Sequence, residues 1–118
     1  MGGKTSRDKG KRGEREFAHV CKEHGYEAHR TAQHMGKDGG EPDVVGLPEV
    51  HLEIKRCETL SLYTAMKQAE RDAKDGFMPV VAHRRNNLPW LMIMNVDDFF
   101  KMYNEYYKTL DLEEGENN

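Results

Sequence analysis

The positions of apolar residues along the chain predict three helices. In residues 14–25 apolar side chains recur at helical spacing, and Gly25 follows them as a stop. A second helix is expected in residues 61–76 and a third around residues 97–110. The side chains expected to face the core from the first two helices are Phe17, Ala18, Cys21, Leu62, Met66, Ala69 and Ala73.

Five strands are expected between these helices, because apolar and polar residues alternate there or form short apolar runs. They lie at residues 26–32, 43–47, 49–56, 78–83 and 90–94. A Gly-rich loop, residues 33–42, precedes the second strand, and a turn with Gly46 and Pro48 predicts a β-hairpin between the second and third. The resulting order, α-β-β-β-α-β-β-α, predicts an α/β fold in which helices pack on a mixed sheet.

A chain of 118 residues, 36% apolar and 33% charged, is expected to form one domain with a single core. No apolar run has the length needed to cross a bilayer, and no apolar stretch follows the basic N-terminus to make a signal peptide. A cytoplasmic location is therefore expected. Cys21 and Cys57 lack a C-x-x-C arrangement, which argues against a zinc ribbon or a disulfide framework.

Charge is sorted along the chain, which divides it into a basic arm at residues 1–12, a domain at 13–110 and an acidic tail at 111–118. Residues 1–15 hold six Lys or Arg against two acids, and residues 105–118 hold five acids against one Lys. The arm, with Lys9, Lys11 and Arg12, suits a DNA phosphate backbone. A flexible, solvated terminus is the alternative interpretation.

The predicted hairpin brings candidate catalytic residues together. Glu53 and Lys55 share one face of the third strand, because side chains two apart on a strand point the same way. Asp43 opens the preceding strand and is expected beside Glu53. Carboxylates in this arrangement suit a hard cation such as Mg²⁺ or Mn²⁺. A cross-strand ion pair at the surface is the alternative.

Glu14 adds a third carboxylate. It lies three, four and seven residues before the apolar positions of the first helix, so it belongs to their core-facing stripe, whereas Glu16 is turned away. A carboxylate on a buried stripe is costly unless a cation or hydrogen-bond donors meet it. A first-turn acid favoured by the helix dipole is the alternative.

Four motifs in order, KG-x-x-x-ERE (Lys9 to Glu16), HRTA (His29 to Ala32), PDVVG and LEIKR, resemble the archaeal-type Holliday junction resolvases of the PD-(D/E)xK nuclease superfamily. The resemblance covers about the first 95 residues and implies a restriction-endonuclease-like core. It implies that Glu14, Asp43 and Glu53 bind the metal, which is Mg²⁺ or, as a substitute, Mn²⁺. It also implies that Lys55 orients or deprotonates the attacking water, or stabilises the developing charge. It also implies that Arg30 and Thr31 contact the scissile phosphate, with Thr in place of the family's Ser.

The leading hypothesis is a metal-dependent endonuclease that cuts branched DNA as a homodimer, since symmetric cutting of a four-way junction needs two active sites. The alternatives are a nuclease for flaps, single strands or duplex, and a non-catalytic DNA-binding module. Gln68, on the second helix, is a further candidate for a place near the active site and for contact with DNA. His51 shares the face of Glu53, and Trp90 is expected in the core or a subunit interface.

Overall fold

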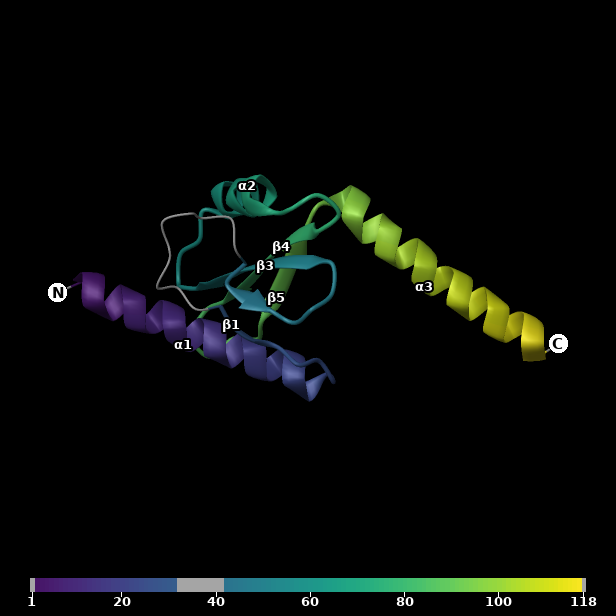
Figure 1. Ribbon diagram of the computed structural model, residues 1–118, viewed down its shortest axis with the longest axis horizontal. Helices are drawn as coiled ribbons and strands as arrows, with labels where there is room; N and C mark the ends of the chain where they lie inside the picture. Colours follow the sequence, from purple (N-terminus) through teal and green to yellow (C-terminus); the bar gives the residue numbers. More distant parts are fainter. Residues whose placement is uncertain (1, 32–41, 118) are drawn as a thin grey trace.

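The computed structural model describes residues 2–31 and 42–117, and the Gly-rich loop expected at 33–42 lies outside these ranges apart from Pro42. The element order is the one expected from the sequence, and it forms a mixed α+β fold (Figure 1). The elements are α1 (Gly2–Glu23), β1 (His29–Arg30), β2 (Val44–Val45), β3 (Val50–Arg56), α2 (Leu62–Asp72), β4 (Met78–Arg84), β5 (Leu91–Met94) and α3 (Val96–Asn117).

The five strands form one sheet in the order β1-β2-β3-β4-β5. β3 and β4 are parallel and joined through α2, and the other neighbouring pairs are antiparallel. The predicted hairpin between β2 and β3 is confirmed, with Val44 opposite Leu52. Its turn needs Gly46, whose φ is +110° and where a Cβ would lie 2.3 Å from the backbone oxygen of Glu27.

Helices cover both faces of the sheet (Figure 1). The side chains of β3 point alternately to one face and to the other. On one face Leu52 and Ile54 of β3 belong to the larger core cluster, together with Phe17, Ala18 and Cys21 of α1. On the other face Val81 of β4 packs with α2. The expected core residues are buried except Leu62, which is exposed at the start of α2, and Ala73, which is half-buried just beyond its end.

Several element boundaries differ from the prediction. The first helix begins at Gly2 rather than near Glu14, so residues 2–12, the expected basic arm, continue into it without a break. Apolar periodicity could not reveal these turns, because residues 1–12 hold almost no apolar side chains. Of the expected strand 26–32, Ala32 lies outside the described residues, and among residues 26–31 His29 and Arg30 are the two that pair with β2.

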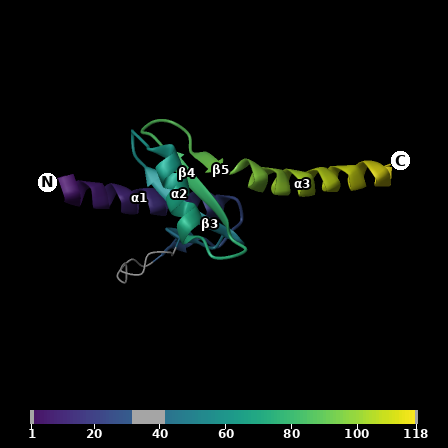
Figure 2. The same ribbon diagram turned by 90° about the horizontal axis from the view of Figure 1, so that it is seen from above.

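α3 is also longer than expected, because it continues from Val96 to Asn117 through the segment expected as an acidic tail. It projects away from the sheet, and the two termini lie at opposite ends of a molecule measuring 64 × 31 × 26 Å (Figure 2). None of the helices in residues 2–31 and 42–117 combines the length and apolar character needed to cross a lipid bilayer.

Candidate active site

The candidate site is built on β3, which carries polar side chains at positions 51, 53 and 55. His51 and Glu53 are the two buried polar residues among those described, with 1% and 3% of their surfaces exposed, and Lys55 follows at the half-buried end of the strand. The alternation of a strand places all three on the face opposite the α1 core. Glu53 therefore stands between an imidazole and an ammonium group.

Asp43 lies beside Glu53, as the hairpin predicts. Val44 pairs with Leu52, the Asp43 backbone N–H donates to the Leu52 carbonyl at 2.9 Å, and the charge of Glu53 acts on the Asp43 carboxylate. The Asp43 side chain accepts a hydrogen bond from the Ile54 backbone N–H at Oδ2, at 2.8 Å. Two hydrogen bonds to the backbone of β3 thus fix Asp43 against this strand.

Glu14 reaches the same region from α1. A close approach at Gly13 seats the helix on the end of β3: a Cβ there would lie 2.5 Å from Cβ of Arg56, so only glycine fits. The next residue, Glu14, accepts a hydrogen bond from Nε of Arg30 on β1 at 2.8 Å, with 12% of its side chain exposed. The cost of a carboxylate on this stripe is thus offset by a guanidinium.

The electrostatics of the site raise the pKa of Asp43 from 3.8 to about 7. Burial is the main cause, and the negative charge of Glu53 is the next. The hydrogen bond from the Ile54 N–H lowers the pKa, Glu14 raises it further, and the Lys55 charge lowers it by less. The protein therefore holds Asp43 where its own cations do not compensate its negative charge.

This donor set fits a hard divalent cation bound through two carboxylates. Mg²⁺ is usually held by one or two carboxylates, several waters and substrate phosphates, and a cation would relieve the repulsion between Asp43 and Glu53. In the described part of the chain no group of three His, Cys, Asp or Glu side chains is placed to hold a metal ion. The predicted third ligand, Glu14, is paired with Arg30 instead, so its role as a ligand stays a prediction.

Four further predicted site residues are Lys55, Gln68, Arg30 and Thr31. Lys55 donates from Nζ to Oε1 of Gln68 at 3.2 Å, so α2 positions the ammonium group. Thr31 donates from Oγ1 to the Pro42 carbonyl, which holds the backbone next to Asp43. Arg30 and Thr31 are both half-buried, and contact of either with phosphate stays a prediction.

The predicted DNA-binding residues at the start of the chain lie on α1. Lys11 and Arg12 are exposed there, within three residues of Glu14. Lys9 belongs to the same helix, and its side chain is outside the described residues. These basic groups thus lie on the helix that also carries Glu14.

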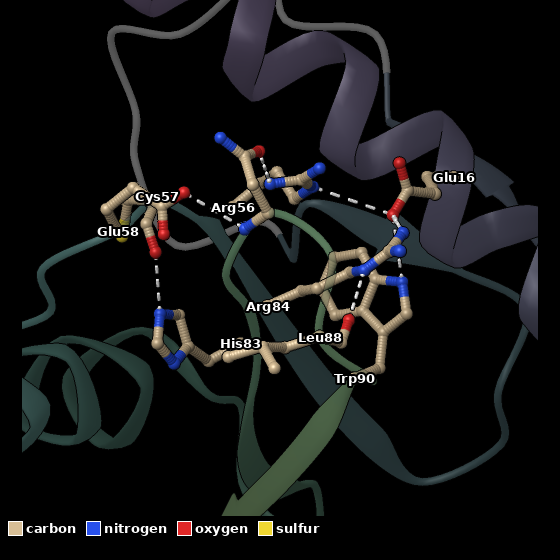
Figure 3. A network of polar contacts seen from close by, with 9 residues as sticks. Glu16, Arg56, Cys57, Glu58, His83, Arg84, Leu88 and Trp90 are labelled. Atoms are coloured by element: carbon tan, nitrogen blue, oxygen red, sulfur yellow. Dashed lines mark hydrogen bonds and ion pairs between the residues drawn. The ribbon is translucent and has the colours of Figure 1, made fainter.

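A second polar network on the other side of α1 escaped the sequence analysis, and Figure 3 shows it. Glu16 accepts hydrogen bonds from Nη1 of Arg84 and, at 3.1 Å, from Nε1 of Trp90, and its carboxylate lies 3.6 Å from Nε of Arg56. The indole of Trp90 also meets Phe17 edge to face, with ring centres 5.0 Å apart, which confirms its predicted place in the core. No spacing in the sequence marks this network, because its partners lie 68 and 74 residues from Glu16.

Comparison with known proteins gives one family. A profile described as archaeal Holliday junction resolvase (Hjc) matches residues 5–113, nearly the whole chain. No curated protein and no solved structure matches the chain. The matched range contains all the candidate site residues, from Lys9 on α1 to Gln68 on α2.

Proposed function

This chain belongs to the archaeal Holliday junction resolvase family, and we propose that it is a Mg²⁺-dependent endonuclease that cuts four-way DNA junctions. The family makes it a nuclease that acts on DNA junctions. The observation that carries the finer proposal is the facing pair Asp43 and Glu53, two carboxylates held beside the Lys55 ammonium group. Such a group is what metal-assisted phosphodiester hydrolysis requires of a protein.

Asp43 and Glu53 would hold the cation, and Glu14 would join them if it left Arg30. When bound, the metal supplies Lewis-acid polarisation of the phosphate and a water of lowered pKa. The chain's own contribution is preorganisation: backbone N–H contact fixes Asp43, and burial fixes Glu53 within a strand. The protein would then need little rearrangement when phosphate oxygens of the substrate replace water molecules in the site.

Lys55 is placed to stabilise charge that develops on the phosphate or to orient the attacking water. Gln68 holds its ammonium group at 3.2 Å through an acceptor oxygen, which limits the rotation of a long flexible side chain. The proton of the attacking water must reach a base, and the phosphate oxygens or solvent can take it without a covalent enzyme intermediate. Lys55 itself can take that proton only if it is neutral before the reaction.

Substrate contact is assigned to the cationic residues around this site. Positive charge near Glu14 comes from Arg30 at the sheet edge, which is its hydrogen-bond partner, and from the exposed Lys11 and Arg12 on α1. Neutralising phosphates with such groups releases condensed counterions, so binding should weaken steeply with salt. Thr31 adds a hydroxyl beside the Asp43 backbone.

We also propose that two copies associate through α3. Its apolar residues recur every three or four positions and remain about half exposed, since the helix projects from the body (Figures 1 and 2). They are Val96, Phe99, Phe100, Tyr103, Tyr106 and Tyr107. An aromatic stripe of this size in water favours association, and a second copy would supply the second active site that paired cuts require.

The nuclease proposal is tested with a labelled immobile four-way junction, and with duplex, flap and single-strand DNA as controls, in Mg²⁺, Mn²⁺ or EDTA. Paired symmetric cuts in the junction alone, absent in EDTA, are expected. Metal-dependent cutting of the controls at equal rates would keep the nuclease but remove the junction preference. Lack of cutting on any substrate, with junction binding retained, would point to a non-catalytic binding module.

The association of two copies is tested by light scattering after gel filtration, with and without junction DNA. A dimer is expected for the natural chain, and a monomer for the double variant Phe99→Ser with Tyr103→Ser, which interrupts the stripe. The matched control is Leu62→Ser, another exposed apolar residue but on α2. A natural chain that stays monomeric in both conditions would overturn the dimer.

A further inference from the structure

The buried histidine of β3 has no role in the chemistry described above. His51 has 1% of its surface exposed and stands two residues before Glu53 on the same face of the strand. Its Nε2 lies 2.8 Å from Oε1 of Glu53, in a contact where both side chains are almost fully buried. A histidine in such a place is costly unless it forms hydrogen bonds, so the contact needs an explanation.

The direction of this hydrogen bond follows from the chemistry of Glu53. An ionised carboxylate can only accept, so Nε2 carries the proton and donates it to Oε1. A neutral imidazole protonated at Nε2 is sufficient for this contact. The bond therefore occupies one carboxylate oxygen of Glu53 and leaves the other, Oε2, for a cation.

We propose that His51 is a positioning residue that orients Glu53 for metal binding; this rests on the metal-dependent function proposed above. Carboxylate ligands need partners outside the metal's own shell to fix their rotation, and loss of such a partner commonly weakens metal affinity 10- to 100-fold. Glu53 has three rotatable side-chain bonds, and the His51 contact restricts them in a buried setting. Lys55 and its partner Gln68 continue the same polar row, so each charged side chain of the row is oriented by a neutral one.

His51 acts through Glu53 rather than as a ligand. Its Nε2 is occupied by the contact with Oε1 of Glu53. The contact is also local, since the two side chains come from one strand and keep their spacing whenever β3 forms. The imidazole can therefore hold Glu53 in place before metal or DNA binds.

The test measures Mn²⁺ binding without DNA, by the electron paramagnetic resonance signal of free Mn²⁺, in the full-length protein. His51→Leu removes the donor at similar volume, and His51→Gln keeps a side-chain N–H. We expect His51→Leu to weaken Mn²⁺ affinity by about tenfold or more, and His51→Gln to weaken it less. Cleavage should follow: the Mg²⁺ concentration for half activity rises, while the rate at saturating Mg²⁺ stays close to that of the natural protein.

The matched control is Val80→Ala, a buried substitution on the opposite face that lowers stability without touching Glu53. It should leave Mn²⁺ affinity unchanged. A folded His51→Leu protein with natural Mn²⁺ affinity would overturn the proposal. If Glu53→Gln also leaves Mn²⁺ binding unchanged, or if the natural protein binds no Mn²⁺, it is the proposed metal site that fails, which separates the two ideas.

A measurement on the natural protein covers the case in which His51→Leu does not fold. Long-range ¹H–¹⁵N spectra of the histidine rings report which ring nitrogen carries the proton. For His51, identified by the signals missing in His51→Gln, protonation at Nε2 is expected, with a change in Nε2 shift in Glu53→Gln. A ring protonated at Nδ1 alone would overturn the assignment of His51 as the donor.

Discussion

Two glutamates of α1, only two residues apart, lie in opposite electrostatic surroundings. Glu16 faces two guanidinium groups, Arg56 and Arg84, so the protein itself neutralises it. Glu14 has one guanidinium partner, Arg30, in a region that also holds Asp43 and Glu53.

The difference lies in the balance of charge. The region of Glu14 has three carboxylates beside two cations, Arg30 and Lys55, whereas the single carboxylate of Glu16 lies beside two guanidinium groups. A surplus of buried negative charge is unfavourable without an external cation. The comparison teaches that two nearby acids on one helix can differ in charge balance: the partners of Glu16 neutralise it, whereas the carboxylates around Glu14 outnumber the cations beside them.

The sharpest test of this contrast is to neutralise the two facing acids. Asp43→Asn and Glu53→Gln should each lower the cleavage rate by about a thousandfold or more, since a metal site contributes several kcal/mol to transition-state stabilisation. Junction binding, measured by gel shift in EDTA, should be retained. Equal losses of binding and cleavage would mean that these residues support the structure instead.

The reverse result is expected for Glu16. Glu16→Gln should lower the free energy of unfolding by about 1–3 kcal/mol, because Arg84 and Arg56 lose their charged acceptor. Urea unfolding followed by circular dichroism measures this. The cleavage rate per folded molecule should stay within about twofold of the natural protein. A loss as large as that of Glu53→Gln would erase the distinction between the two sides of α1.

The raised pKa of Asp43 predicts an unusual dependence of stability on pH. Because the folded state binds this proton more tightly than the unfolded state, stability is highest below pH 3.8 as far as this group is concerned, and it falls as pH rises toward and through 7. The net loss should be on the order of 1–2 kcal/mol, less than the full shift implies because solvent reaches part of the group.

Asp43→Asn is the variant that checks this pH dependence. It should be more stable than the natural protein at pH 8 and similar to it near pH 4, as shown by melting temperatures at the two pH values. Added Mg²⁺ should stabilise the natural protein at pH 8 and leave the variant unchanged, since ligand binding to the folded state raises its stability. Identical melting curves at pH 8 without metal would show that Asp43 is already neutralised by its neighbours.

The smallest effect is expected at Gln68. Gln68→Ala should lower the cleavage rate about 5- to 10-fold, because Lys55 loses the acceptor that holds its ammonium group. Single-turnover cleavage at saturating metal and DNA measures this step. Glu70→Ala, an exposed neighbour on the same helix, should have no effect on the rate. If both variants cleave like the natural protein, Lys55 is positioned by other contacts.

Local sequence patterns were enough to predict the order of the elements and half of the candidate site. Alternation on β3 placed Glu53 beside Lys55, and the Gly46 turn set Asp43 next to Glu53. These relations depend on the two-residue period of a strand and on a short hairpin, which a sequence displays directly. The helical start of α1 was missed because residues 2–12 hold almost no apolar residues, so no apolar periodicity marks these turns.

Tertiary structure alone decided which partners each charged group meets. Glu14 pairs with Arg30, Glu16 pairs with Arg84 and Trp90, and the pKa of Asp43 is raised by burial. These outcomes depend on distances and solvent exclusion between segments far apart in the chain, which no local spacing encodes. The sequence determined by itself that carboxylates and a lysine share one hairpin. The packing of α1 and α2 on the sheet decided which of them remain without a compensating charge from the protein.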